Sequence, residues 1–293
     1  MSRKLASILL IVVTTGSIAA IFATSPDLET TANLLAGASI ALIGLSLLLE
    51  RKFPFRSVWN KNQGDLRGDL TSFFGVFVIL DGALNALAPV AVAALLGPLT
   101  DRELPVPFAA EVVLVFLLIE LMAYATHRVH HQWTPLWRLH AMHHSAERLY
   151  TLNNFRFHPV NHIFNSLMIV TPPLLIGFSA ESVLAYTALT LPILVFGHAN
   201  IDLEFGRLNY ILNTNEVHRW HHSAEPRHGA CNLGRALVIW DHVFGTYVAP
   251  KPADAPSSLG FLESSKDAYP PSQRFLDQLA FPFTARSTSD STE

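Results

Sequence analysis

Four long apolar runs occupy most of the first 126 residues and restrict the chain to a membrane fold. They cover residues 5–23, 32–49, 70–98 and 107–126, and the first two contain no charged side chain. Each is close to or above the roughly 20 residues that an α-helix needs to cross a bilayer. Half of all residues are hydrophobic, 15% are charged and the mean hydropathy is +0.32, which is typical of membrane proteins. We therefore expect an all-α integral membrane protein with about four transmembrane helices.

A further apolar stretch in the second half of the chain is divided into two shorter limbs. The limbs at 163–178 and 183–197 flank the polar string SAES, and both are short for a full crossing. We interpret them as a helical hairpin that dips into the membrane. Beyond Pro250 the chain is rich in Pro and Ser, with one apolar patch from Phe275 to Phe283 that we expect to rest on the membrane surface.

Charge predicts the orientation of the spans. Arg3 and Lys4 resemble the start of a secretory signal, but the apolar run that follows exceeds the usual length of about 7 to 15 residues, so we expect a retained span. Basic residues then gather after the second run, as the positive-inside tendency predicts for a cytoplasmic loop. These residues are Arg51, Lys52, Arg56, Lys61 and Arg67. Eight arginines between 128 and 235 put the histidine-rich part of the chain on the same, cytoplasmic side.

Two single residues bear on this orientation. Asp81, within the third run, marks either a buried polar contact or the turn of a re-entrant pair, and the second option would invert everything downstream. The lone Cys231 excludes an internal disulfide and agrees with a reducing compartment.

Histidines are concentrated in three short groups. Twelve of the fourteen lie between His127 and His222, mostly in HRVHH at 127–131, HAMHH at 140–144 and HRWHH at 218–222. Spacings of three and four residues bring side chains to one face of a helix. Eight of the grouped histidines form such pairs or lie directly beside one, namely His127, His131, His140, His143, His144, His218, His221 and His222. With His198 they make nine candidate imidazoles, enough for two metals with four or five ligands each. Imidazole suits iron, zinc, copper and nickel, so the donors alone do not select the metal.

Other metal chemistries lack their patterns in this chain. No HExxH string for a zinc protease occurs, and Glu120, Glu147 and Glu216, the glutamates near the groups, are not in the ExxH pattern of a soluble di-iron protein. A transporter would place its ligands in the middle of the spans, whereas these groups follow the apolar runs. Any single histidine is as well explained as an ordinary polar residue, but three spaced groups indicate a metal centre at the membrane interface.

Six ordered motifs resemble the fatty acid hydroxylase and sterol desaturase superfamily. They are HRxxH, HxxHH, FRFHP at 155–159, HAN at 198–200, HRWHHS at 218–223 and WDHVFGTY at 240–247, so the resemblance spans about 110–250. It implies two iron ions, and metal ligands at His127, His131, His140, His143, His144, His198, His218, His221 and His222. His158 matches the histidine of FRFHP and is either a tenth ligand or a neighbour of a ligand.

The chain departs from the superfamily pattern at two places. Asn232, Leu233 and Gly234 stand where Asn-Tyr-Gly is common, and His242 replaces a frequent arginine. Neither touches an expected ligand. The resemblance also divides the chain into an N-terminal transmembrane region (1–106), a hydroxylase-like catalytic domain (107–250) and a Pro/Ser-rich tail (251–293).

The expected reaction is O2-dependent hydroxylation of an unactivated C–H bond of a lipid, with lipid or sterol desaturation as the alternative and a non-enzymatic metal-binding membrane protein as a remote one. No catalytic residue is expected apart from the metal ligands, and zinc is a conceivable substitute for iron in a preparation. Asn200 and Asp241 are candidate acceptors for ring N–H groups, and Asn154 and Arg156 are candidates for bridging a ligand loop to the site.

Partners follow from what the chain lacks. One cysteine cannot hold an iron–sulfur cluster, which needs four, and no GxGxxG string marks a flavin or nicotinamide site. No bound flavin, haem or cluster is predicted, so electrons must come from an external ferredoxin, cytochrome or reductase. A net charge of −3 argues against nucleic acid. Fatty acyl chains, ether lipids, ornithine lipids, sterols, hopanoids and carotenoids all remain open as substrates.

Overall fold

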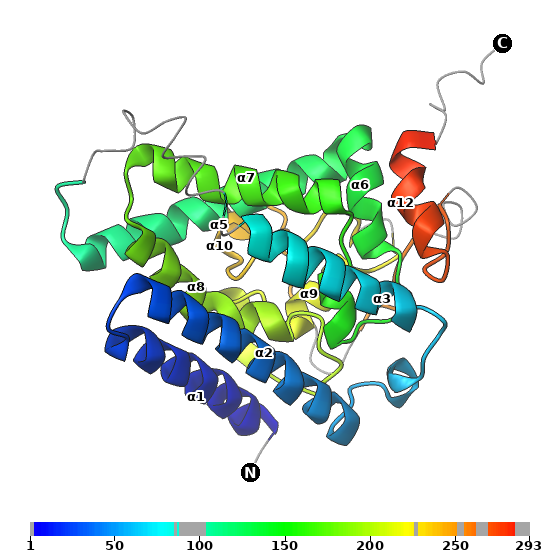
Figure 1. The fold of residues 1–293 in the computed structure, drawn as a ribbon. Coiled ribbons are helices and arrows are strands. Elements are labelled where there is room, and N and C mark those ends of the chain that lie inside the picture. Colours follow the sequence, from blue (N-terminus) through cyan, green and yellow to red (C-terminus); the bar gives the residue numbers. More distant parts are fainter. Residues whose placement is uncertain are drawn as a thin grey trace.

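The computed structural model describes residues 3–84, 87, 104–225, 228–250, 255–261 and 269–284, and the regular elements within these ranges are helices (Figure 1). Three of the described helices are long and apolar enough to cross a membrane: α1 (Arg3–Thr24), α2 (Leu28–Lys52) and α5 (Phe108–Gln132). They coincide with three of the four predicted apolar runs. The expectation of an all-α fold with membrane-spanning helices is confirmed, and the number of spans stays a prediction.

The spanning helices keep large apolar side chains on their outer surfaces. Val12 on α1 is 60% exposed, Ile40 on α2 is 66% exposed and Val113 on α5 is 58% exposed. Water would penalise such continuous apolar surface, whereas hydrocarbon accepts it without cost. The arrangement is that of helices with one face toward lipid and the other toward the protein.

The third predicted run begins as a helix. It comprises α3 (Leu66–Ser72), the π-helical segment η2 (Phe73–Leu80) and further helix to residue 84. Asp81 lies within this helix, and its Oδ1 is 2.9 Å from His162 Nε2, so of its two interpretations the polar contact is the one found. Residues 85, 86 and 88–103 lie outside the described ranges, and the single span across 70–98 therefore stays a prediction.

The predicted hairpin is formed by α7 (Pro159–Ile176) and α8 (Ala180–Phe196). Gly177 ends α7 with a positive φ of 95°, a conformation that glycine adopts at no steric cost, and the Ser179 side chain caps α8 by accepting from Ser182 N. α8 packs against α1, α2 and α5, while α7 packs against α5. α8 thus lies between the spanning helices, and α7 lies against one of them.

A second break brings two histidine groups to one end of the bundle. α5 ends at Gln132 and α6 (Thr134–His144) follows after one extended residue, Trp133. Pro135 lies in the first turn of α6, where proline is tolerated because its missing N–H would have no helical partner. The chain therefore turns just before Pro135.

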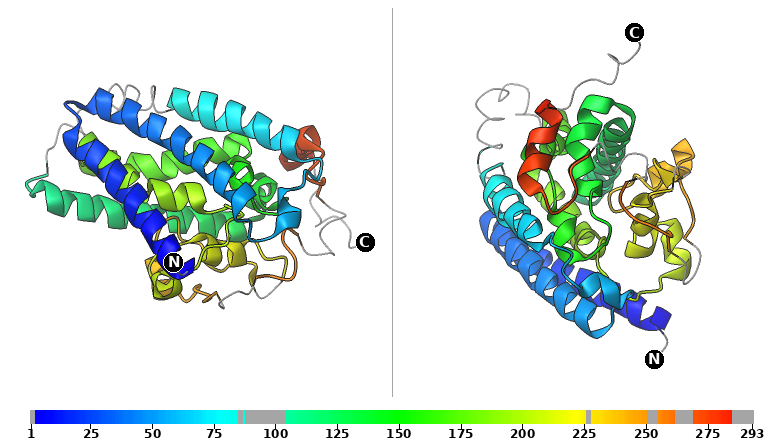
Figure 2. Two further views of the ribbon diagram at one scale, coloured as in Figure 1. Left: turned by 90° about the horizontal axis from the view of Figure 1, so that it is seen from below. Right: turned by 90° about the vertical axis from the view of Figure 1, so that its right-hand side faces the viewer.

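Short elements cover this end of the bundle (Figure 2). They are η1 (Ser57–Asn60), η3 (Thr151–Phe155), η4 (Gly206–Tyr210), α9 (Asn215–His221), α10 (Ile239–Phe244) and the C-terminal α12 (Phe275–Thr284). Buried ion pairs join the segments on either side of η3 to the N-terminal part of α3: Arg148 Nη2 lies 2.7 Å from Oδ1 of Asp65, the residue before α3, and Arg156 pairs with Asp69. Arg3 at the start of α1 pairs with Asp202 at 2.9 Å. The N-terminus of α1, the C-termini of α2, α5 and α8 and the histidine elements therefore share one end.

Candidate metal centre

Nine histidines converge at this end in two compact groups. Within each group the candidate ligand nitrogens all lie within 4.8 Å of one another. The five-histidine group consists of His127, His131, His140, His144 and His221, and the four-histidine group of His143, His198, His218 and His222. These are the nine positions proposed from the sequence as ligands, drawn together from α5, α6, α9 and the segment after α8.

Helical geometry explains how each residue reaches its group. On α6, His140 and His144 are one turn apart and enter the five-histidine group, while His143 points about 60° from His140 and about 100° from His144 and enters the other. α9 divides its histidines in the same way, because His218 and its C-terminal neighbour His222 enter the four-histidine group and His221 enters the five-histidine group. Two short helices therefore supply both groups. The groups adjoin where the rings of His144 and His222 stack at a centroid distance of 4.4 Å.

Backbone carbonyls determine the tautomers in the five-histidine group. Nδ1 of His127 lies 2.9 Å from the Leu233 oxygen, and Nδ1 of His221 lies 2.9 Å from the Cys231 oxygen. A carbonyl only accepts, so each Nδ1 carries the proton and each Nε2 presents a lone pair. His131 follows the same pattern with the Gly229 oxygen at 3.0 Å.

The Nε2 atoms so prepared point at one another. His140 Nε2 lies 3.1 Å from His127 Nε2 and 3.2 Å from His144 Nε2. Lone pairs at this separation repel unless a cation lies between them. Two nitrogens bound at about 2.1 Å to one metal are themselves about 3.0 to 3.4 Å apart, so the spacing fits a metal ion. His131 Nε2, buried without a hydrogen-bond partner among the described residues, supports the same reading.

The four-histidine group is oriented by an amide that sequence reasoning missed. His198 Nδ1 lies 2.9 Å from Asn153 Oδ1, and the Asn153 amide nitrogen donates to the Arg148 carbonyl at 2.6 Å. The second contact fixes the amide orientation, so His198 Nδ1 donates and its Nε2 is free to bind metal. That Nε2 lies 3.0 Å from His218 Nε2. The signal available in the sequence was only the neighbouring Asn154.

Burial keeps these rings neutral. Removal from water lowers the pKa of His143 to about 3, with the nearby His218 as a second cause, and lowers the pKa of His218 to about 4. Both rings are therefore unprotonated near neutral pH, which is the form that binds metals. The donor set fits an ion that prefers imidazole nitrogen.

A second overlooked residue, His130, acts through a chain of hydrogen bonds. His130 Nδ1 donates to the Thr126 carbonyl at 2.7 Å, so His130 Nε2 must accept from the Asn161 amide nitrogen at 2.5 Å. The Asn161 oxygen then faces His140 Nδ1 at 3.2 Å. A backbone carbonyl thereby sets the tautomer of His140 through two side chains. No sequence signal marks this role, because His130 lies off the helical face that His127 and His131 share.

His158 is not brought into either group. Its Nδ1 accepts from Val160 N at 3.2 Å and caps α7, and its Nε2 donates to the Leu279 carbonyl on α12 at 3.1 Å. Both ring nitrogens are therefore occupied by contacts that hold helices together.

The four candidate supporting residues contact backbone and other side chains instead of ring nitrogens. Asp241 accepts from Leu233 N at 2.7 Å and Gly234 N at 2.8 Å, and so holds the loop whose carbonyls orient His127 and His221. Leu233 orients His127 through its backbone carbonyl. Because the side chain takes no part in this contact, leucine in place of the common tyrosine is compatible with the site.

The side chains of the other three residues likewise bind groups other than the histidine rings. Asn154 donates to the Leu194 carbonyl at 2.9 Å, and Asn200 donates to the Arg56 carbonyl at 2.9 Å. Arg156 binds Asp69, and it donates to Gln278 Oε1 on α12 at 2.9 Å.

Glu50, at the end of α2, also supports the centre, a role that the sequence did not indicate. It is buried, and its Oε1 accepts from Thr151 N at 2.6 Å and from Asn200 N at 2.8 Å. Thr151 lies two residues before Asn153 in the sequence, and Asn200 lies two residues after His198. Glu50 thus ties α2 to the segments that orient the four-histidine group.

Comparisons with known proteins agree with this arrangement. A family model described as "Fatty acid hydroxylase" matches residues 112–246, which include all nine grouped histidines. The ornithine lipid hydroxylase OlsE of Rhizobium tropici is 33% identical over 258 residues, covering 86% of this chain and 76% of that protein. The chain belongs to the fatty acid hydroxylase family.

Other relatives of this family member match about half of the chain. Alkylglycerol monooxygenase of Danio rerio is 34% identical over 146 residues, and that of Homo sapiens is 33% identical over 135 residues. The match covers 50% and 46% of the chain but only 32% and 30% of those proteins. No solved structure matches the chain. Family membership confirms the expectation of an oxygen-dependent, lipid-oxidising membrane enzyme.

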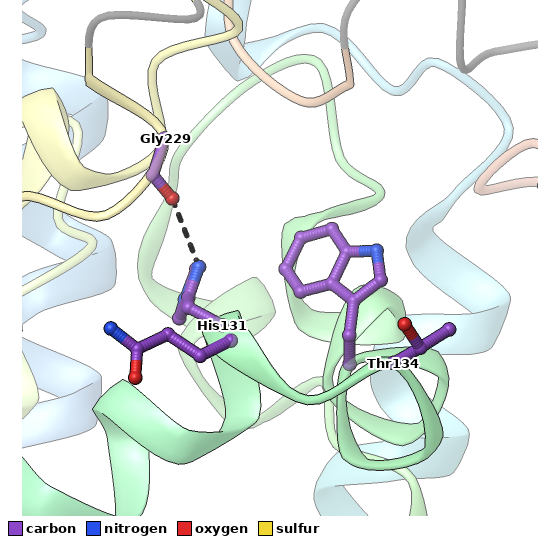
Figure 3. Close-up of a pocket in the computed structure, with 5 residues that line it drawn as sticks. His131, Thr134 and Gly229 are labelled. Atoms are coloured by element: carbon purple, nitrogen blue, oxygen red, sulfur yellow. Dashed lines mark hydrogen bonds between the residues drawn. The ribbon is translucent and has the colours of Figure 1, made fainter.

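One cavity of this fatty acid hydroxylase opens beside the five-histidine group. It has a volume of about 170 Å³ and is lined by His131, Gln132, Thr134, Trp137 and Gly229 (Figure 3). The Trp137 ring lies 5.1 Å from the His131 ring and 5.5 Å from the His144 ring, between centroids. The cavity therefore gives small molecules a way to the outer side of the histidines.

Proposed function

We propose that this chain is a di-iron lipid hydroxylase that inserts one oxygen atom of O2 into an unactivated C–H bond. The observation that carries the proposal is the convergence of nine imidazoles into two adjoining groups. Five and four nitrogen donors suit two ions, and family membership favours iron over zinc, which would occupy the same donors in a preparation.

Iron, when bound, would supply the oxygen activation, and the protein residues prepare the site for it. Carbonyls of Leu233, Gly229 and Cys231 present neutral Nε2 atoms to the five-histidine group. Asn153 and Asn161 do the same for His198 and His140. Rings held in this way need no rearrangement to bind metal, which lowers the cost of assembling the centre.

Electron supply requires a partner. The overall reaction converts R–H, O2, two electrons and two protons into R–OH and water. We propose an external ferredoxin, cytochrome or reductase as donor, approaching the cytoplasmic side. The cytoplasmic assignment is supported by Arg3 at the start of α1 and by Arg51 and Lys52 at the end of α2, since both ends lie beside the histidines.

The two alternatives and the expected domain division remain part of the proposal. Desaturation shares the first hydrogen abstraction with hydroxylation, and the two differ in the fate of the carbon radical. The relatives named hydroxylase and monooxygenase favour hydroxylation. We retain the boundaries 1–106, 107–250 and 251–293, while noting that Glu50 of the first region contacts the second.

The test uses the full chain in lipid nanodiscs. We expect about two iron ions per chain after iron loading, and lipid products that have gained one oxygen atom when O2 and a reductase system are supplied. His140→Ala should lose both properties, whereas His242→Gln, at a histidine outside both groups, should keep them. Products that have lost two hydrogens would favour desaturation. Iron-loaded protein that oxidises no lipid from total extracts, with several donors, would contradict the proposal.

A further inference from the structure

One arginine near the five-histidine group is linked through Tyr186 to the middle of α5, a helix long and apolar enough to cross a membrane. Arg235 follows Leu233 by two residues, and its Nη1 donates to the Tyr186 hydroxyl on α8 at 2.8 Å. That hydroxyl donates to Glu120 Oε1 at 2.7 Å. Glu120 lies near the middle of α5, two turns before His127, which places this polar cluster about 10 Å from the histidines along the helix axis.

Most N–H donors of the Arg235 guanidinium have no side-chain partner among the described residues. Glu120 is fully buried and also accepts from Ala236 N at 3.0 Å and Leu237 N at 2.9 Å, and Tyr186 is 2% exposed. Arg235 itself is exposed, although Gly234 and Ala236 on either side are buried. A guanidinium has five donors, and one side-chain bond is formed among the described residues. A cation at membrane depth is costly without a partner and is usually functional.

An anionic group faces the same region. The charge of Asp81 acts on Arg235, and the Asp81 side chain is 30% exposed beside His162. His162 directly follows Asn161, which orients His140. Two different elements therefore bring opposite charges near the five-histidine group, Arg235 from the 228–238 segment and Asp81 from the helix that begins at α3.

We propose that Arg235 and Asp81 form a headgroup site for a zwitterionic lipid. An anionic oxygen group of the headgroup binds the free donors of Arg235, and its amine lies toward Asp81. A purely anionic headgroup is disfavoured because Asp81 would repel it, and an uncharged one offers no charged acceptor to the remaining donors of Arg235. The inference rests on the proposed function and specifies the substrate class of that same site. Two lipid classes carry this chemistry, amino-acid lipids through a carboxylate and aminophospholipids through a phosphate.

Substrate competition in nanodiscs tests the site. The full iron-loaded chain is offered an amino-acid lipid, phosphatidylethanolamine, phosphatidylglycerol and an uncharged alkylglycerol with matched acyl chains. Wild type should oxidise one of the two zwitterionic lipids with a kcat/KM at least about tenfold above the others, and which of the two is preferred separates carboxylate from phosphate. Arg235→Gln should remove about a factor of ten from that preference through KM, as expected for loss of a charge-assisted bond. Arg235→Lys should retain part of it, and Arg207→Gln, at an exposed arginine of η4, should leave it unchanged.

A binding measurement separates this inference from the proposed function. Native mass spectrometry of metal-free protein should show retention of the zwitterionic lipid by wild type and Arg207→Gln but not by Arg235→Gln, and it needs no turnover. Iron content serves as the folding control for each variant. Equal oxidation and equal retention of the uncharged and zwitterionic lipids by wild type would overturn the headgroup site. Selective retention without oxidation would support the site while contradicting the hydroxylase.

Discussion

At the scale of single residues, the centre depends on which ring nitrogen carries the proton. Three carbonyls and two amides hold Nδ1–H groups and turn Nε2 lone pairs inward. The sequence pointed to the rings through their helical spacing. It contained no signal for the acceptors, because a backbone carbonyl has no residue identity and the amides Asn153 and Asn161 lie in other segments than the rings they orient.

Asn161→Leu tests this orientation. The change removes both the acceptor on His140 Nδ1 and the donor to His130 Nε2. We expect iron affinity to fall about 10- to 100-fold, the usual effect of losing a group that orients a metal-bound histidine. Asn161→Asp, which keeps an acceptor facing His140, should lose less. Chelator competition measures the affinity, and wild-type affinity in Asn161→Leu would show that the relay is unimportant.

At the scale of elements, the FRFHP string illustrates a motif whose place was recognised and whose role was not. Arg156 and His158 both contact α12, through Gln278 and the Leu279 carbonyl. Sequence alone could not indicate this, since the partners lie more than 115 residues away. The motif docks the C-terminal helix onto the side of the metal centre. Leu276 and Phe283 of α12 are exposed, and the expected contact of α12 with the membrane surface stays a prediction.

His158→Ala separates a docking role from metal binding. Loss of the α7 cap and the contact to α12 should lower the free energy of unfolding by about 1 kcal/mol. Iron content should stay at the wild-type value, because His158 lies in neither histidine group. Metal analysis and thermal unfolding measure the two effects. A loss of iron equal to that of His140→Ala would restore His158 as a tenth ligand.

At the scale of the whole molecule, the histidine groups connect segments that are distant in the chain. The candidate ligands come from α5, α6, α9 and the segment after α8. Glu50 connects α2 to the same centre through Thr151. Metal bound to these groups would therefore act as a cross-link within the folded state. Binding only to the folded chain stabilises it by mass action.

Metal removal should consequently lower stability. At a free metal concentration a hundred times the Kd, each bound site contributes about 2.7 kcal/mol. We expect the thermal midpoint to fall after chelation and to recover when Fe²⁺ is added back under anaerobic conditions. His140→Ala, whose five-histidine group is incomplete, should respond less than His242→Gln. Identical midpoints for metal-free and loaded wild type would contradict this expectation.

The metal-free protein should also be sensitive to acid. Burial lowers the pKa of His143 and His218 to about 3 and about 4, from 6.5. At pH values between the lowered pKa values and 6.5, the unfolded chain binds protons more strongly than the folded chain. The stability is therefore greatest above about pH 6.5 and declines as the pH falls toward 4. Denaturant unfolding at about pH 7.5 and about pH 5.5 measures the decline. The double variant His143→Gln/His218→Gln should decline less, and a metal-free wild type that is more stable at the lower pH would contradict the sign.

The order of residues along the chain determined the local features: apolar runs long enough to span a bilayer, and histidines spaced for one face of a helix. Both follow from the fixed rise and rotation of the α-helix, so they can be recognised without knowing the fold. Tertiary structure decided how α6 and α9 divide their histidines between two groups, that His158 docks α12, and that Glu50, Asn153 and His130 support the centre. These roles arise from contacts between segments far apart in the chain, or from backbone groups that every residue shares, and only the folded arrangement specifies them.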